Sequence, residues 1–390
     1  MSDKSIVIGG GLAGLLCARR LLLRGRSFCL VDTPVTSLGS GLGGFAEFSG
    51  AKFSMLPAGR GLVPVAGSEE LLQDAIRDVV GLLALERFPV VRSNEVDFEK
   101  ESGLALRGYD SYVLSPEQVA LLVRELASAI PLNAVIHGRV TAVAEAGQGD
   151  WCVHLDNGEE VSGKNVIFAG GRTGAALLGA AGAQEQPGKG ADFGIRIEFS
   201  DRSALAPLRS FGADAKLLAG HCRTFCLNSP GSIFHYPVDP GILIPGGVVA
   251  DQSVRAGNVG LLCRVDDKKA ALGRFHDAVR SYPGGNAQLS YFAPNHRKVV
   301  DIQRLRVFFG EDVVQALAAF VTAIDRAGLI RFEQGCTVHY PLVDWHWSTF
   351  GVSNSFATTK PGLYVVGDLA GHARGLLQSA VSGWLSAGAL

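Results

Sequence analysis

Residue types that could transfer a proton or bind an anion gather in a few short segments of the chain. His235 and Tyr236 stand in the segment FHYP, and the same order of types returns at His339 and Tyr340 in VHYP. A histidine exchanges protons near neutral pH, whereas an arginine can hold a carboxylate through two parallel hydrogen bonds. Arg223 and the second His-Tyr pair are further candidates. The principal candidate catalytic residues are His235, Tyr236, His372, Arg374 and Arg60.

Each of these residues also has a plainer interpretation. A histidine taken singly is more often a satisfied structural residue than a catalytic one, and His372 and Arg374 are equally compatible with solvated loop side chains. The segment DWHW at residues 344–347 is typical either of an aromatic wall beside a substrate or of ordinary packing. A catalytic role therefore depends on the elements that bring these side chains together.

A glycine cluster near the start of the sequence is the strongest motif. A short apolar run at residues 6–8, typical of a buried strand, leads into Gly9, Gly11 and Gly14 in the order G-x-G-x-x-G. Apolar residues at helical spacing follow to residue 22, and a second apolar run ends at Asp32, which lies 23 residues after Gly9. In this pattern the glycines permit a tight turn, close approach of a pyrophosphate and close helix packing.

The expected helix would offer free backbone N–H groups, beginning at Leu12 and Ala13, to a diphosphate. Asp32 stands where an acid accepts hydrogen bonds from ribose hydroxyls, and its charge disfavours a ligand with a 2′-phosphate. The alternative is a structural glycine turn followed by a surface aspartate. The motif predicts an adenine dinucleotide site, but by itself it does not distinguish FAD from NAD.

Later segments favour FAD. Gly43 and Gly44 look like the double-glycine segment that in many FAD proteins lies near the diphosphate and the flavin, although a flexible loop would look the same. The strand expected at residues 164–168 ends at Ala169 and Gly170, a turn that resembles the one where flavoproteins approach the cofactor. Val140 stands where such proteins often hold the adenine through backbone contacts.

The end of the sequence carries a second glycine-rich motif. GLYVVGD at residues 362–368 reads as a strand that delivers Gly367 and Asp368, and a helix is expected to begin at Leu376 and Leu377. This order resembles the closing motif of the glutathione-reductase-like FAD superfamily. The resemblance implies that the acid binds the ribityl or phosphate region and that the helix N-terminus faces the flavin. A packed C-terminal helix with an acid before it is the alternative.

Three internal segments narrow the resemblance. DFGIRIE (residues 192–198), CRTFC (222–226) and GRTG (171–174) together look like the poorly characterised bacterial FAD-dependent dehydrogenases. The chain departs from the expected closing pattern in having Asp368 where a glutamate is common, followed by His372 and Arg374. Because these two side chains would lie near the flavin edge, they are expected to define a substrate of this protein's own.

The expected fold class is α/β, with a Rossmann-like FAD-binding domain, built on a three-layer parallel sheet, and an inserted α+β substrate domain. Ser115 and Pro116 predict the start of a helix, and three strands are expected between it and residue 168. The predicted FAD-binding domain is discontinuous (1–60, 105–185 and 335–390), and the substrate or cap domain comprises 61–104 and 186–334.

Composition limits the possible partners. The 390 residues are 47% hydrophobic with a net charge of −1, so no basic face is predicted and nucleic acid is not an expected partner. Seven scattered cysteines and the lack of a signal peptide or membrane span favour a cytoplasmic protein. HCRTFC at residues 221–226 lacks a second ligand pair, so no metal site is predicted. The oligomeric state is left open.

No second dinucleotide motif accompanies the first, so no separate NAD(P)H domain is expected. The predicted activity is therefore FAD-dependent oxidation of a small organic substrate, with hydride transfer to flavin N5. The alternatives are an NAD(P)H-dependent flavin monooxygenase or reductase, and a flavoprotein that acts on RNA or on a protein redox partner.

Overall fold

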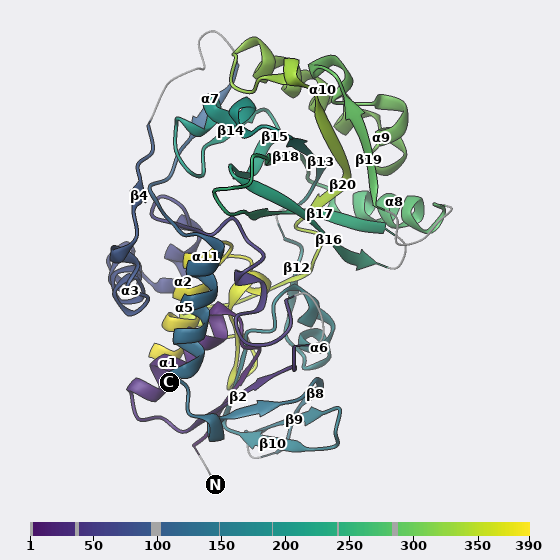
Figure 1. The fold of residues 1–390 in the computed structure, drawn as a ribbon. Coiled ribbons are helices and arrows are strands. Elements are labelled where there is room, and N and C mark those ends of the chain that lie inside the picture. Colours follow the sequence, from purple (N-terminus) through teal and green to yellow (C-terminus); the bar gives the residue numbers. More distant parts are fainter. Residues whose placement is uncertain are drawn as a thin grey trace.

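The computed structural model describes residues 3–35, 39–94, 103–147, 149–188, 190–239, 242–282 and 288–390, which pack around two hydrophobic cores (Figure 1). The first core holds both ends of the described chain, and the second holds most of its middle. The first core defines the first domain, and the second core defines the second domain.

A parallel sheet organises the first domain. Its order places β1 in the centre, between strands that come from the beginning, middle and end of the sequence. Because all five strands run parallel, their carboxyl ends meet at one edge, where the loops after β1, β2, β11 and β22 lie together. The strands in order are β22 (Leu363–Val365), β11 (Asn165–Phe168), β1 (Ser5–Ile8), β2 (Phe28–Asp32) and β7 (Val135–His137).

The two terminal helices of the first domain pack directly on each other. These are α1 (Leu12–Leu23) and α11 (Leu376–Gly388). A Cβ added at Gly383 would lie 1.9 Å from the Ala13 carbonyl oxygen, so glycine permits this close crossing. Arg20 donates to the Trp384 carbonyl oxygen at 2.6 Å and lies over the Trp384 ring. The beginning and the end of the described chain therefore pack against each other.

Smaller elements complete the first domain. The helix predicted at Ser115 is α5, and a full capping box between Ser115 and Gln118 explains its start. An antiparallel sheet buries Trp151 and Val153 in the same core. The elements are α2 (Val63–Ala66), α3 (Glu69–Leu82), α5 (Pro116–Ser128), α6 (Ala175–Ala180), β3 (Lys52–Ser54), β4 (Val90–Val91), β6 (Ser111–Val113), β8 (Val140–Glu145), β9 (Trp151–Leu155) and β10 (Glu160–Gly163).

A seven-stranded sheet forms the second domain, as Figure 1 shows at the top of the view. Each neighbouring pair of its strands is antiparallel. The strands in order are β19 (Leu289–Ala293), β20 (Cys336–Asp344), β13 (Ala191–Phe199), β18 (Gly257–Val265), β15 (Cys222–Asn228), β14 (Lys216–Ala219) and β5 (Ala105–Arg107).

The two faces of this sheet differ in polarity. One face packs against the helices α8 (Lys268–Arg280), α9 (Ile302–Phe309) and α10 (Glu311–Arg326), and Phe193 of β13 contacts Phe275 and Phe309 there. Since side chains alternate along a strand, Asp192 and Arg196 of β13 lie on the opposite face. That face is covered by the hairpin of β16 (Gly231–Asp239) and β17 (Ile242–Val249).

The predicted domain boundaries differ from the structure in two places. The prediction puts residues 61–104 in the substrate domain, but Leu72, Val79 and their neighbours on α2 and α3 are buried in the first core. Conversely, it puts β20 in the FAD-binding domain, but this strand pairs with β13 and β19 in the second sheet. The apolar residues Val338 and Leu342 explain this position, because they are buried in the second core.

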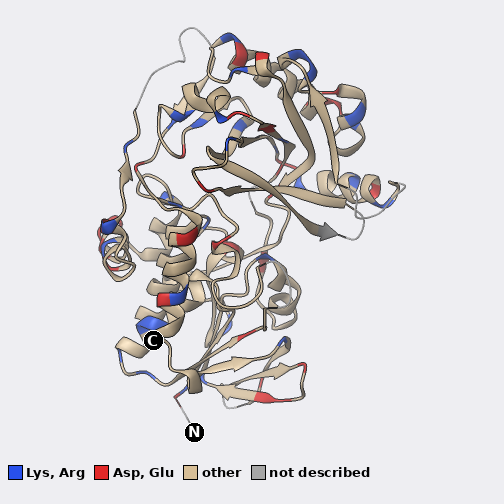
Figure 2. Cartoon of the chain, viewed as in Figure 1, with Lys and Arg blue, Asp and Glu red and all other residues tan. Residues whose placement is uncertain are grey.

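Charged residues of both signs are interspersed along both domains (Figure 2). Within the described ranges, every helix is too short or too polar to cross a lipid bilayer. The remaining short elements are α7 (Ala206–Arg209), β12 (Glu185–Gln186) and β21 (Thr349–Phe350).

Candidate functional site

The glycine cluster lies at the carboxyl edge of the parallel sheet. A Cβ added at Gly9, whose φ is +99°, would lie 2.6 Å from the Ala169 carbonyl oxygen, so the loops after β1 and β11 touch. A Cβ added at Gly14 would lie 1.8 Å from the Gly9 carbonyl oxygen. At Gly11, by contrast, no atom lies within 4 Å of an added Cβ. Gly9 and Gly14 are thus required by packing, whereas Gly11 faces open space.

Helix α1 begins beside this space with its backbone donors available. No side chain caps its N-terminus at Gly11, and no acidic residue stands in its first turn, which contains Leu12 and Ala13. The first N–H groups of a helix have no partner within the helix and carry its positive dipole. This arrangement suits an anionic group bound next to Gly11.

Asp32, at the end of β2, has a carboxylate oxygen without a partner. Its Oδ2 atom is buried and accepts no hydrogen bond among the described residues. Burial raises the pKa of Asp32, although backbone hydrogen bonds from Gly10 and Thr33 act to lower it. A buried carboxylate oxygen without a donor is unfavourable, so the position fits a ligand that supplies a hydroxyl.

Three other predicted cofactor residues lie at the same edge. The Gly43 backbone N–H donates to the Gly10 carbonyl oxygen at 2.8 Å. A Cβ added at Gly44 would lie 3.3 Å from the Gly11 Cα. Val140 begins β8, which follows β7, the strand that pairs with β2. The double-glycine segment therefore lies directly against the glycine cluster.

The closing motif also reaches this edge. Gly367 follows β22, and its N–H donates to the Ser382 hydroxyl at 3.0 Å. Helix α11 starts at Leu376, with buried Leu377 next, after Gly375, whose φ of +111° favours glycine. Like α1, α11 has no side-chain cap and no acidic residue in its first turn. Two uncapped helix N-termini thus lie at one edge of the sheet.

Asp368 is held by an arginine that the sequence motifs do not predict as a site residue. The Nε atom of Arg172, in the loop after β11, donates to Asp368 Oδ2 at 2.7 Å. The Arg172 guanidinium also lies 4.1 Å from the centre of the Trp347 ring. Burial acts to lower the pKa of Arg172, but the charges of Asp368, Tyr236 and Asp344 and the hydrogen bond to Asp368 together outweigh it, so the net shift is upward.

Asp344 is the centre of a second ion-pair group. Its side chain is 3% exposed and accepts hydrogen bonds from Arg374 and, at 3.1 Å, from Arg223. Burial acts to raise the pKa of Asp344, but the charges of Arg374 and Arg223 hold it well below its usual range. The Arg374 guanidinium lies 5.1 Å from the Trp345 ring and 5.6 Å from the Trp347 ring. DWHW therefore supplies both a carboxylate and an aromatic wall.

Asp192 extends this network on the same face of the sheet. Its side chain, 1% exposed, accepts from Arg223 at 2.6 Å and from Arg264 at 2.9 Å. Arg196 is also fully buried, but its hydrogen-bond acceptors are neutral: Asn258 Oδ1 at 2.8 Å and the carbonyl oxygens of Cys226 and Pro245. Burial lowers the pKa of Arg196.

The predicted pair His235 and Tyr236 does not share one environment. Tyr236 lies in the field of the buried charges, and burial raises its pKa while Arg172 acts to lower it. The His235 ring lies 5.6 Å from the His339 ring, and His339 Nε2 is 3.2 Å from Glu198 Oε2. Burial and His339 lower the pKa of His235. Successive residues of a strand point to opposite faces, which explains the separation.

The remaining candidates lie apart from the arginine network. His372 Nδ1 is 2.8 Å from the Gly61 carbonyl oxygen, so His372 connects the closing motif to the loop before α2. Arg60 is exposed and forms no ion pair with the described residues. Tyr340 packs against Tyr291 and Phe308 in the second core. Of the five principal candidates, Arg374 and Tyr236 lie with the buried charges.

His346 is a polar residue that the sequence motifs do not single out. Its Nε2 atom is buried without a hydrogen-bond partner among the described residues. Burial and the charge of Arg172 lower the pKa of His346 to about 4, so the ring is neutral at pH 7. Its position inside DWHW, and that of Arg172 inside GRTG, are the only signals in the sequence.

One group of described side chains has the composition of a metal site. Cys152, His154 and Glu160 bring their ligand atoms within 4.8 Å of one another on β9 and β10. His154 Nδ1 is 3.1 Å from Glu160 Oε1, so the two already form an ion pair when the histidine is protonated. The sequence does not predict this group, and the cysteine-rich segment at residues 221–226 is not among such groups in the described chain.

Comparisons with known proteins find solved structures only. No protein-family model matches the chain, and no curated protein matches it. Tetracycline destructase Tet(51) is 13% identical with a TM-score of 0.44, and the match covers 100% of this chain and 81% of that one. CtdE in complex with FAD is 14% identical with a TM-score of 0.43, covering 100% and 85%.

A flavoprotein/dehydrogenase from Cytophaga hutchinsonii is 14% identical with a TM-score of 0.44, and the match covers 99% of this chain and 75% of that one. Because each of these TM-scores is below 0.5, the likeness carries no weight in assigning a cofactor. The assignment has to come from the chain's own residues.

Proposed function

We propose that the chain is an FAD-dependent oxidoreductase that oxidises a small anionic organic substrate. The observation that carries the proposal is the buried, unpaired Oδ2 of Asp32 beside the open space at Gly11. A dinucleotide supplies a ribose hydroxyl for the Asp32 carboxylate and a pyrophosphate for the space at Gly11.

The residues present fit FAD. Asp32 would bind the adenosine ribose, and the first turn of α1 with Gly11 would bind the pyrophosphate. The closing motif, with Asp368 and the uncapped N-terminus of α11, gives a second positive helix end for the flavin. When bound, FAD supplies a hydride acceptor at flavin N5, so the chain's own residues have to bind the substrate, orient it and manage its proton.

The excess of arginines over aspartates in this network favours an anionic substrate. Since 5 arginines less 3 aspartates leave 2 positive charges among these described residues, a carboxylate would neutralise one of them. Arg374 is best suited to hold it, because its guanidinium stacks on Trp345 and carries donors beyond those used by Asp344. The arginines are Arg172, Arg196, Arg223, Arg264 and Arg374, and the aspartates are Asp192, Asp344 and Asp368.

Tyr236 and His346 have distinct proton roles in this proposal. Because burial raises the pKa of Tyr236, its hydroxyl stays protonated at neutral pH and acts as a hydrogen-bond donor to the substrate. His346 is neutral with an unpaired Nε2, so it can accept a proton as the substrate is oxidised. Asp344 remains ionised and holds Arg374 in place.

The cofactor is tested first. Purified protein should be yellow and should release FAD on denaturation, and deflavinated protein should bind FAD again. Protein that stays colourless after incubation with FAD would overturn the proposal.

The substrate class is tested by anaerobic flavin reduction. We expect amino acids or hydroxy acids to bleach the flavin and the amines or alcohols that lack the carboxylate to leave it yellow. Bleaching by NADPH alone would replace this activity with that of a monooxygenase or reductase. If neither class bleaches the flavin, an RNA or protein partner becomes the better explanation.

A further inference from the structure

Two cysteines face each other across neighbouring strands of the second sheet. Cys222 of β15 and Cys263 of β18 are register partners in the antiparallel pair. Both are free thiols and both are buried, with relative exposures of 3% and 4%. The sequence does not reveal this pair among its seven scattered cysteines, because the two stand 41 residues apart (263 − 222).

The hydrogen-bond pattern brings these two side chains unusually close. The Arg264 N–H donates to the His221 carbonyl oxygen at 2.8 Å, so His221 and Arg264 form a hydrogen-bonded pair. Pair types alternate along an antiparallel ladder, and Cys222 and Cys263 are therefore a non-hydrogen-bonded pair. Such pairs have Cα atoms about 4.5 Å apart, within the roughly 4.4–6.8 Å that a disulfide requires.

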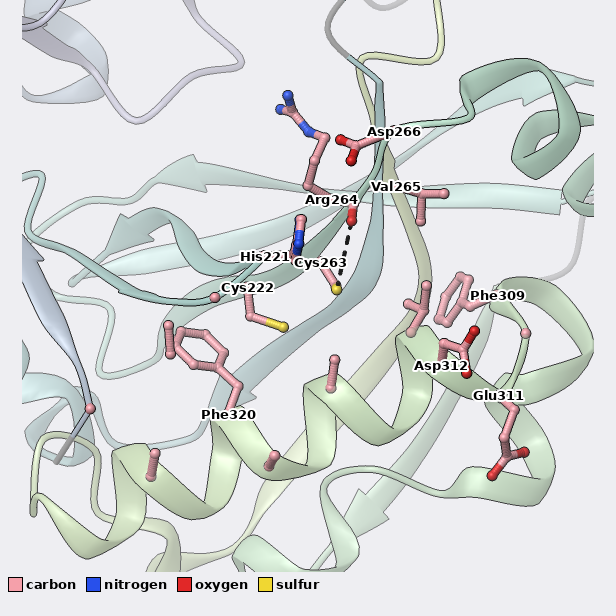
Figure 3. Close-up of a pocket in the computed structure, with 18 of the residues that line it drawn as sticks. His221, Cys222, Cys263, Arg264, Val265, Asp266, Phe309, Glu311, Asp312 and Phe320 are labelled. Carbon is pink, nitrogen blue, oxygen red and sulfur yellow. Dashed lines mark hydrogen bonds between the residues drawn. The ribbon is translucent and has the colours of Figure 1, made fainter.

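The pair opens onto a cavity of about 960 Å³ between the sheet and α10. Ala316, Ala319 and Ala323 line its helical wall, and their small side chains explain why space remains there. Figure 3 shows both sulfur atoms on the side of the strands that faces α10. The cavity has the size of a small-molecule site, roughly 300–1,000 Å³.

The two thiols interact with each other. A hydrogen bond with Cys222 lowers the pKa of Cys263, and the same contact raises the pKa of Cys222. Both thiols line the cavity, so Cys263 can attack a molecule bound there and Cys222, its register partner, can resolve the mixed disulfide.

The opposite face of the same two strands carries the arginines of the candidate site. Arg223 follows Cys222 and Arg264 follows Cys263, and both arginines bind Asp192. Figure 3 shows the Arg264 guanidinium pointing away from α10. A bond between the cysteines would thus join the two strands that position these arginines.

We propose that Cys222 and Cys263 form a dithiol site that exchanges with a low-molecular-weight disulfide entering this cavity. The Cys263 thiolate attacks one sulfur of the small disulfide, whose S–S bond breaks and releases one thiolate. The Cys222 sulfur then attacks Cys263 in the mixed disulfide and releases the second thiolate. The small disulfide is reduced to two thiols, the protein pair is oxidised to one disulfide, and the two protein thiol protons end on the two products.

Bis(2-hydroxyethyl) disulfide, which is neutral and compact, is the probe. After the full chain is incubated with it, thiols are alkylated under denaturing conditions and counted. We expect the count to fall from seven to five, because two thiols form one disulfide, and peptide mass spectrometry to find Cys222 joined to Cys263. Dithiothreitol should restore seven. The count should be the same on yellow or colourless protein, so this test is independent of the proposed flavin.

Variants locate the exchange. Cys222→Ser has six thiols. It should either keep all six or lose one as a mixed disulfide at Cys263, and it should form no cross-link. Cys336→Ser, which removes another buried cysteine from the same sheet, should still lose two thiols, from six to four. The proposal is overturned if the unaltered chain keeps seven thiols, or if a different pair is joined. Neither of these results depends on a variant that has to fold.

Discussion

Asp32→Asn separates a ligand-binding role for Asp32 from a structural one, because the two roles predict opposite changes. Asparagine keeps one oxygen for the backbone donors of Gly10 and Thr33 but replaces the unpaired, charged Oδ2. A ribose hydroxyl would lose a hydrogen bond to a charged group, which contributes about 1.5–3 kcal/mol. FAD should therefore bind roughly 10- to 150-fold more weakly. Titration of deflavinated protein, followed by quenching of flavin fluorescence, measures this change.

Without FAD, the substitution should not destabilise the protein, in contrast to its effect on FAD binding. Since the folded-state pKa of Asp32 is raised, the buried charge destabilises the fold above that pKa, and this penalty is absent below the unfolded-state pKa. Asp32→Asn should thus leave the FAD-free protein at least as stable at neutral pH. The control is Asp277→Asn, an exposed aspartate paired with Arg280 on α8, which should change neither quantity. FAD affinity within twofold of the unaltered chain would refute the reasoning, as would a marked loss of stability without FAD.

Five further substitutions test other parts of the site and of the fold. Gly11→Ala should fold normally, since its Cβ meets no atom within 4 Å, and yet it should weaken FAD binding. Gly383→Ala should lower stability by about 1–3 kcal/mol in thermal unfolding, because its Cβ would meet a carbonyl oxygen of α1 at 1.9 Å. Asp344→Asn should lower stability at neutral pH by about 3–5 kcal/mol. Because the pKa of Asp344 is depressed, this contribution is fully present above about pH 4 and is lost as the pH falls further. The stability of the variant should therefore depend less on pH below about 4 than that of the unaltered chain. The unaltered protein should lose stability as the pH falls from about 6.5 to the folded-state pKa of His346, about 4, because only the unfolded histidine takes up a proton in that range. His346→Gln should remove this loss of stability. Arg374→Lys should raise the substrate KM by an order of magnitude or more, roughly 1.4 kcal/mol, while FAD affinity stays unchanged. If substrate binding and FAD binding weaken equally, Arg374 acts on the fold instead.

The parallel sheet and its glycine edge could be predicted from the sequence because each element is marked locally. Short apolar runs indicate β1 and β2, and the capping signal at Ser115 indicates the start of α5. The relation between Gly9 and Asp32 follows from their strands, since carboxyl ends of parallel strands share one edge. The boundary at β20 could not be predicted in this way, because whether a buried strand joins one sheet or another depends on its distant partners.

The ion-pair network was harder to predict for a similar reason. Arg172 and Asp368 stand almost two hundred residues apart (368 − 172 = 196), and only the pairing of β11 with β22 brings their loops together. His235 and Tyr236 look like one pair in the sequence, yet strand alternation sends them to different surroundings. That alternation could have been applied to the sequence once the segment was recognised as a strand.

The same alternation explains how one pair of strands can carry two separate chemistries. Arg223 and Arg264 contribute to the charged face that the β16–β17 hairpin covers, whereas Cys222 and Cys263 stand on the face that meets α10. The charged face cannot rearrange freely, because Asp192 is almost fully buried and depends on both arginines for its hydrogen bonds. A disulfide beneath this face would therefore restrict the motion of the very residues that set the charge of the candidate substrate site. Flavin reduction by a carboxylate substrate, compared before and after oxidation of the dithiol, should change in rate, and an unchanged rate would mean that the two faces act independently.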